Sequence, residues 1–121
     1  MIKAMKFVGV PVGDQQRALD FYTEKLGFRV ITDQPFDDEQ RWIELGIGRS
    51  STGIVLFTPA GQEGRIGTYT GIAFVADDVK ATSRELKARG VVFVQEPQEA
   101  DWGTSAIFAD ADGNQFVLGS P

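Results

Sequence analysis

The sequence predicts an α+β fold of two paired β-α-β-β-β modules that together form a concave, partly closed sheet. Segments with strand and helix periodicity follow one another in the same order before and after a Gly- and Pro-containing linker at 59–69. The expected helix caps recur too, because Asp14 and Asp78 are 64 residues apart and Gly27 and Gly90 are 63 apart. A four-stranded unit that is covered by a helix on one face must also bury the other face. Pairing two such units achieves this.

The first module, residues 1–58, carries helix and strand signals in turn. Asp14 stands where a helix N-cap is expected, and Gly27 where a left-handed C-cap is expected. Apolar side chains at three- and four-residue spacing between them predict one buried helix face. The polar, acidic stretch 33–40 is typical of a hairpin loop. We expect a helix at 15–26 and strands at 5–12, 28–32, 41–45 and 53–57.

The second module, residues 70–121, repeats this order. A polar loop is expected between residues 95 and 105. The run from Asp110 through Asp112 and Gly113 to Asn114 could hold a metal or form a turn. The turn is favoured because Asp-Gly and Gly-Asn supply the positive φ angles of a tight hairpin. We expect a helix at 79–88 and strands at 71–75, 91–95, 105–109 and 115–118.

The composition excludes several classes of function. The chain has 12 Lys and Arg against 17 Asp and Glu, a net charge of −5, so we expect neither nucleic acid nor a membrane surface as a partner. It contains no Cys and no His, which excludes disulfides, thiolate nucleophiles, serine–histidine triads and histidine-ligated metals. Its 121 residues predict a single domain, 1–121. We expect a cytoplasmic location, because no apolar stretch of signal-peptide length is present near residue 1.

Several short motifs resemble one known family, the vicinal oxygen chelate superfamily of glyoxalases, bleomycin-resistance proteins and extradiol dioxygenases. The resemblance covers nearly the whole chain and is specific for the fold rather than for a reaction. The motifs are Val10-Pro11-Val12 before Asp14, Arg17–Tyr22, Leu26-Gly27-Phe28, Asp78-Val79, Arg89-Gly90-Val91 and Asp110–Asn114.

The resemblance also implies where a metal would bind. Enzymes of the family hold a divalent metal with His, Glu or Gln side chains at equivalent places of the two halves, which here are Phe7, Gly71, Val55 and Val117. None of these side chains offers a donor atom to a cation. Gln115 is the nearest polar residue, and it has no partner on those strands. We therefore expect no metal and no cofactor.

Strand alternation predicts the lining of the cavity, because residues two apart share a face. Ile43 and Leu45 suit the helix-packed face, which assigns Trp42 and Glu44 to the concave side. Trp42 could instead be a core or dimer-interface aromatic. The predicted lining residues are Phe7, Trp42, Glu44, Val55, Phe57, Gly71, Gln115 and Val117.

Three further features have both a functional and a plain interpretation. Trp102, in the expected polar loop, could close the pocket or hold the loop to the domain. Glu44 could be a desolvated acid–base group or a rim residue in water. The acidic run 37–39 could steer a cationic ligand or could simply be a solvated loop.

Two functions from different classes remain. The first is a metal-free protein that binds an aromatic or amphipathic small molecule, with a cationic one as an option, as the bleomycin-resistance branch of the family does. The alternative is a lyase, isomerase or dioxygenase-like enzyme that uses Glu44 or an unrecognised metal site. A regulatory or structural dimer without a ligand is a third possibility. A homodimer is expected, both from the open edge strands of each module and from the resemblance.

Overall fold

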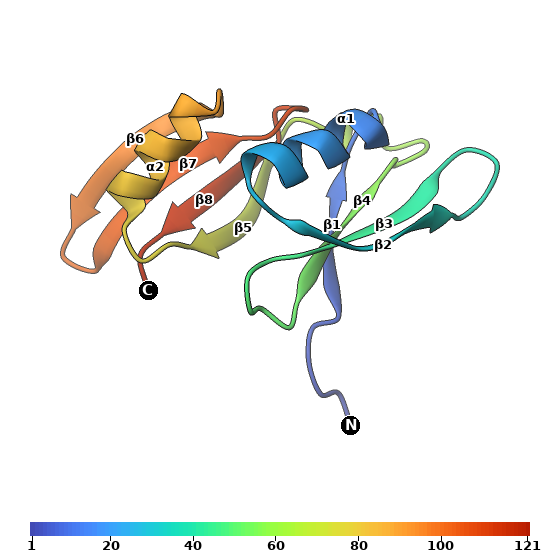
Figure 1. The fold of residues 1–121 in the computed structure, drawn as a ribbon, viewed down its shortest axis with the longest axis horizontal. Helices are drawn as coiled ribbons and strands as arrows, with labels where there is room; N and C mark the ends of the chain where they lie inside the picture. The colour runs from blue at the N-terminus through green and yellow to red at the C-terminus, as the bar shows by residue number, and fades with distance from the viewer. The chain divides into compact units, whose positions relative to one another are not determined.

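The computed structural model describes residues 1–121 and confirms the α+β class and the two β-α-β-β-β modules (Figure 1). The chain divides into two compact units, Met1–Ile66 and Gly67–Pro121. Each unit has its own four-stranded sheet, and neither sheet is closed. No helix combines the length and the apolar character needed to cross a bilayer.

The first unit orders its strands β1-β4-β3-β2, with β1 parallel to β4 and the other pairs antiparallel. The segment predicted as a linker, 59–69, contains one short 3-10 turn, η2, and the first residue of β5. The elements of this unit are β1 (Phe7–Pro11), α1 (Gln15–Asp20), η1 (Phe21–Lys25), β2 (Arg29–Pro35), β3 (Arg41–Gly46), β4 (Gly53–Phe57) and η2 (Glu63–Arg65).

The first helix begins and ends as the sequence predicts, but its last part is wider than an α-helix. The side chain of Asp14 accepts a hydrogen bond from the Arg17 backbone N–H at 3.0 Å, and Gly27 has a φ of +74°. Residues Phe21–Lys25 form a π-helix, which corrects the expectation of an α-helix over 15–26. The hydroxyl of Thr23 donates to the Leu19 carbonyl at 2.8 Å and so competes with the regular helical bonds of this turn.

Two strands extend into stretches that were predicted as loops. β2 continues to Pro35, and β6 (Val92–Ala100) meets β7 (Gly103–Ala109) through a turn at residues 101–102. Both hairpins are stabilised by backbone pairing and by charged pairs rather than by buried apolar residues; Lys80 bonds to Glu99 at 2.5 Å, for example. Because few side chains in these extensions are buried, apolar periodicity does not predict them as strands. The other predicted strand ends lie within two residues of the observed ones.

One face of the first sheet packs against α1. Ile43, Leu45, Ile54 and Leu56 are at most 2% exposed, and α1, which contacts β3 and β4, buries Ala18 and Leu19. Burying such side chains contributes roughly 1.5–3 kcal/mol each to folding. The opposite face of this sheet carries the residues of the candidate site.

The second unit repeats the arrangement with the strand order β5-β8-β7-β6. Asp78 caps α2 by accepting from the Ala81 N–H at 2.9 Å, and Gly90 follows the helix with a φ of +92°. The core contains a cluster of rings in which Phe108 and Phe116 stack with centroids 5.7 Å apart. The remaining elements are β5 (Tyr69–Val75), α2 (Val79–Ala88) and β8 (Gln115–Gly119).

The stretch 110–114 forms a turn between β7 and β8, as the Asp-Gly and Gly-Asn pairs predict. Asp110 uses its carboxylate to accept bonds from the backbone N–H and the side-chain amide of Asn114, both at 2.9 Å. Asn114 is fully buried and also accepts from the Gly67 N–H at 2.8 Å. Gly113 has a φ of +84°, which only glycine adopts without strain.

Removing the amide of Asn114 is expected to destabilise the protein. Asn114→Ala loses the bonds to Asp110 and Gly67 in a buried setting, so the free energy of unfolding should fall by about 2 kcal/mol. Urea denaturation measures this change, with the exposed Gln98→Ala as the control. An equal loss in both variants would contradict the role assigned to Asn114.

Candidate functional site

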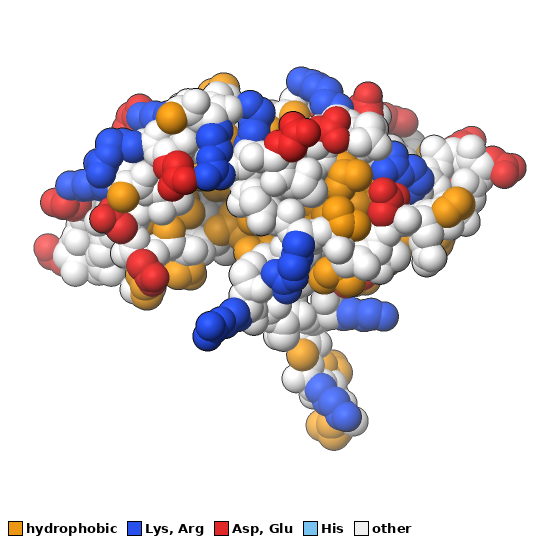
Figure 2. All heavy atoms as spheres, viewed as in Figure 1, with side chains coloured by type: hydrophobic (Ala, Val, Ile, Leu, Met, Phe, Trp, Pro, Cys, Tyr) orange, Lys and Arg blue, Asp and Glu red, His pale blue; other side chains and the backbone are white.

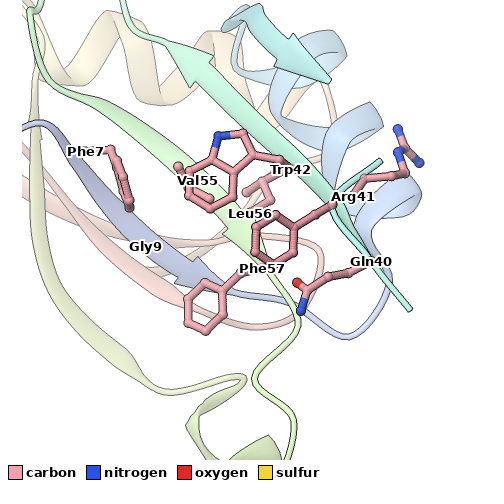
Figure 3. Close-up of a pocket in the computed structure, with 9 residues that line it drawn as sticks. Phe7, Gly9, Gln40, Arg41, Trp42, Val55, Leu56 and Phe57 are labelled. Carbon is pink, nitrogen blue, oxygen red and sulfur yellow. The ribbon is translucent and has the colours of Figure 1, made fainter. Parts of the chain in front are cut away.

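A pocket of about 270 Å³ lies on the face of the first sheet opposite α1 (Figure 3). Three strands of the first unit, together with the hairpin between β2 and β3, form it. Aromatic and aliphatic groups dominate the lining. The lining residues are Phe7, Gly9, Phe36, Gln40, Arg41, Trp42, Val55, Leu56 and Phe57.

The strand register explains why predicted residues from three strands meet here. Gly9 lies opposite Val55 across the parallel β1–β4 pair, and Val55 lies opposite Glu44 across β3–β4. Paired residues point to the same face of a sheet, and this face continues two residues along each strand. The structure thereby brings together four of the predicted residues: Phe7, Trp42, Val55 and Phe57.

Three rings form a continuous wall. The Trp42 ring meets Phe7 edge to face, with centroids 5.5 Å apart, and meets Phe36 in a tilted contact at 5.7 Å. Phe36 is 62% exposed, so most of its ring is available to a ligand. Val55, at 3% exposure, forms the floor beside this wall. Such a surface suits a flat apolar molecule.

The Phe57 ring lies across the backbone of β1 because residue 9 is glycine. A Cβ atom at Gly9 would lie 3.0 Å from Cε1 of Phe57. The side chain of Phe57 would have to move if residue 9 were larger. Gly9 therefore sets the position of the second aromatic surface of the pocket.

The pocket opens where β3 and β4 separate. Their pairing ends at Ile43 and Leu56. Beyond it the buried side chain of Gln15, from the start of α1, takes the place of the missing partner. Its Nε2 donates to the carbonyls of Arg41 at 2.8 Å and Leu56 at 2.9 Å, and its Oε1 accepts from the Arg41 N–H at 2.9 Å.

The side chain of Gln40, which precedes β3, bonds to the backbone just after the end of β4. Its Oε1 accepts from the backbone N–H of Thr58 at 3.1 Å. The amide end of the Gln40 side chain lies toward the Phe57 ring (Figure 3). Gln40 is thus the one lining residue that brings a side-chain amide to the aromatic surface.

Charged groups of both signs border the pocket. The exposed hairpin residues 37–39 carry three carboxylates next to Phe36 in the sequence. The guanidinium of Arg65 lies 5.3 Å from the centre of the Phe57 ring, a cation–π distance. The guanidinium of Arg41 points away from the pocket rings (Figure 3) and donates hydrogen bonds to Asp33 and Gln16. The bond to Asp33 lowers the pKa of the Asp33 carboxyl group.

Glu44 shares the face of Trp42 but is not among the residues that line the pocket. It is half-buried and lies between Val55 on β4 and Thr32 on β2. No hydrogen bond or ion pair within the chain engages its carboxylate. The group is therefore available to a ligand that extends along β3.

The other predicted residues lie in the second unit. Gly71, Gln115 and Val117 belong to the parallel strands β5 and β8; Val117 pairs with Ala73 and Gln115 with Tyr69. Trp102 is 72% exposed in the β6–β7 turn. None of these four residues lines the pocket of the first unit.

The residues at the expected metal positions do not fit a metal. Phe7, Val55 and Val117 have hydrocarbon side chains and Gly71 has none, whereas divalent metals bind through oxygen, nitrogen or sulfur. No group of three or more carboxylates is arranged to hold a cation elsewhere in the chain.

The sequence did not indicate Phe36, Gln40, Gln15 or Arg65 as functional residues. Phe36 and Gln40 fall in the stretch 33–40, which was predicted as a polar hairpin loop, and an isolated aromatic among acidic residues was the available signal for Phe36. Gln15 and Arg65 carry no signal in the sequence, since each acts on residues that the fold alone brings near.

Sequence comparison with known proteins indicates one protein superfamily. Residues 4–118 match the Glyoxalase/Bleomycin resistance protein/Dioxygenase superfamily. The uncharacterized protein YetH of Bacillus subtilis is 38% identical over 118 residues, which cover 98% of each chain. A probable lactoylglutathione lyase of Vibrio parahaemolyticus is 32% identical, with coverage of 88% of this chain and 83% of the relative.

Solved structures of proteins from this superfamily are similar to the chain. A member of the same superfamily from Sphaerobacter thermophilus is 33% identical with a TM-score of 0.90, covering 99% of this chain and 98% of that one. TnmS3, an antibiotic binding protein from Streptomyces sp. CB03234, is 35% identical with a TM-score of 0.85, covering 99% and 97%. The chain belongs to the Glyoxalase/Bleomycin resistance protein/Dioxygenase superfamily.

Proposed function

We propose that the protein is a metal-free binding protein that takes up an aromatic or amphipathic small molecule. One observation carries this proposal: the rings of Phe7, Trp42, Phe36 and Phe57 wall the pocket, and Phe7 and Val55, at two of the positions where the resemblance implies metal ligands, have hydrocarbon side chains. Aromatic walls with few polar groups are typical of sites that bind flat ligands. The similarity to TnmS3, described as an antibiotic binding protein, supports binding rather than catalysis.

We also propose that two copies of the chain associate. The pocket, at about 270 Å³, is at the small end of ligand sites, which suits a cavity that a second chain completes. The second unit also exposes apolar side chains on the face opposite α2, among them Val75, Val92 and Val94 at 53–69% exposure. A two-fold dimer is the commonest way to cover such a surface.

The charges predict how a cationic ligand would lie. Arg65 already occupies one face of Phe57 and repels a second cation there. The carboxylates of residues 37–39, which follow Phe36 in the chain, attract one. Acidic and basic side chains are otherwise intermixed on the face in Figure 2, without a large basic patch. We expect a positive group of the ligand to lie beside Phe36.

The alternative is an enzyme of the same superfamily, a lyase, isomerase or dioxygenase-like protein with Glu44 as its acid–base group. The free carboxylate of Glu44 on the pocket face favours it, as does the similarity to a probable lactoylglutathione lyase. Turnover that Glu44→Gln abolishes without loss of binding would support this alternative.

A flat aromatic ligand is expected to quench the fluorescence of Trp42. The chain has two tryptophans, so Trp102→Ala leaves Trp42 as the one indole fluorophore. Titration with aromatic antibiotics and their charged and neutral analogues should give saturable quenching in this variant. Trp42→Ala should weaken binding, measured by thermal shift, by about tenfold or more, because stacking and buried area are both lost.

Trp102→Ala is the matched control and should bind as the parent protein does. The proposal fails if no aromatic compound binds, or if the best ligands bind Trp42→Ala as tightly as they bind the parent protein.

The purified protein is expected to hold no stoichiometric metal. Nickel, zinc, manganese or iron should not raise its unfolding temperature, whereas a ligand at 100 times its Kd adds about 2.7 kcal/mol of stability. Elemental analysis after mild purification measures the content. About one metal ion per chain would contradict the proposal.

The protein is expected to be a dimer at tens of micromolar. Light scattering coupled to gel filtration should give about twice the chain mass of 13.2 kDa. Replacing Val92 and Val94 together by Thr should shift the particle toward the monomer, because the exposed apolar face becomes polar. A monomeric parent protein would contradict the expectation.

A further inference from the structure

We propose that the side-chain amide of Gln40 is a preset hydrogen-bond donor to the ligand, so that the pocket selects flat aromatic compounds with an acceptor, such as a carbonyl oxygen, on the ring edge. The inference rests on the proposed function and specifies its ligand class. Gln40 then becomes the residue that determines specificity within an otherwise apolar pocket.

The hydrogen bond to Thr58 fixes which end of the amide faces the ligand. A backbone N–H can donate only to an oxygen, so the atom that lies 3.1 Å from the Thr58 nitrogen is Oε1. The other end of the amide is therefore the NH₂ group. It makes no hydrogen bond within the chain, and it lies at the pocket surface beside Phe57 (Figure 3).

The backbone of Gln40 is held as firmly as its side chain. Its N–H donates to Oδ1 of Asp37 at 2.9 Å, and its carbonyl accepts from the N–H groups of Phe36 and Asp37, both at 3.2 Å. The residue cannot turn its amide away without breaking the Thr58 bond. A donor held in place before binding loses little conformational entropy when a ligand arrives.

The other polar groups near the pocket are engaged elsewhere or directed elsewhere. Both backbone groups of Arg41 bond to the Gln15 amide, and its guanidinium bonds to Asp33 and Gln16. The indole nitrogen of Trp42 lies on the side of its ring away from Gln40 (Figure 3). An acceptor that reaches the Phe57 side of the pocket therefore meets the Gln40 NH₂ group.

The preference for a ligand with an acceptor follows from the desolvation of the Gln40 NH₂ group on binding. A hydrocarbon ring edge that covers the NH₂ group removes its water and offers nothing in return, whereas a carbonyl oxygen replaces the lost hydrogen bond. The difference is expected to be about tenfold in affinity, the usual value of one such bond.

The matched pair 1-indanone and indane tests this preference, because the two bicyclic molecules differ by one carbonyl group. In the parent protein 1-indanone should bind about tenfold more tightly than indane, as measured by titration of tryptophan fluorescence. The side-chain NH₂ resonances of Gln40 in the ¹H–¹⁵N spectrum should shift with 1-indanone and much less with indane.

The variant Gln40→Glu removes the hydrogen-bond donor and keeps the acceptor that bonds to Thr58. Its carboxylate still accepts from the Thr58 N–H, but it offers no donor, so the indanone-to-indane ratio should fall to about one or below. Gln16→Glu is the control, since it makes the same chemical change on α1, at the opposite face of the sheet, and should leave the ratio unchanged.

Equal affinities for the two compounds in the parent protein, or a ratio that Gln40→Glu leaves unchanged, would overturn the inference and leave the proposed function standing. If neither these two nor any other aromatic compound binds, both fail. If Gln40→Glu does not fold, the Gln40 resonances of the parent protein decide the matter: no greater shift with 1-indanone than with indane would overturn the inference.

Discussion

Gln15 inserts its amide between the ends of β3 and β4, and the pocket depends on that insertion. In a regular ladder the strands would continue to pair and bring the chain after Phe57 against Arg41. The three bonds of Gln15 satisfy the freed backbone groups of Arg41 and Leu56 instead. Because Gln15 also starts α1, the same residue joins the helix to the point where the strands diverge. The helix on one face of the sheet is thereby linked to the strand separation that shapes the pocket on the other face.

Each sheet has a helix on one face only, and the two units use the remaining face differently. In the first unit it carries Phe7, Trp42 and Phe57 around a cavity. In the second unit it carries small or aliphatic residues such as Ala73 and Val117 and lacks a comparable wall of rings. The two units therefore share an architecture and differ in the chemistry of these faces, as expected when function resides in a site rather than in a fold.

Local signals account for what the sequence could predict. Caps such as Asp14 and Gly27 act within four residues, and strand alternation is enough to place Trp42 and Glu44 on one face. Long-range contacts account for the rest. Gln15 reaches a strand 26 residues away, and Gln40 reaches Thr58 across the fork between β3 and β4. Polar side chains that replace backbone partners look like ordinary surface residues in a sequence, so the donor of the pocket could not be recognised there.

Two of the positions where the resemblance implies metal ligands are also part of the aromatic pocket. Phe7 occupies a predicted ligand position and also packs edge to face against Trp42, and Val55 occupies another and forms the floor. Restoring a donor at one position would remove part of the wall without completing a coordination sphere, which needs three or more donors. A metal site and this aromatic pocket therefore compete for the same residues. An enzyme built on the present lining would have to rely on Glu44, which lies beside the pocket rather than in it.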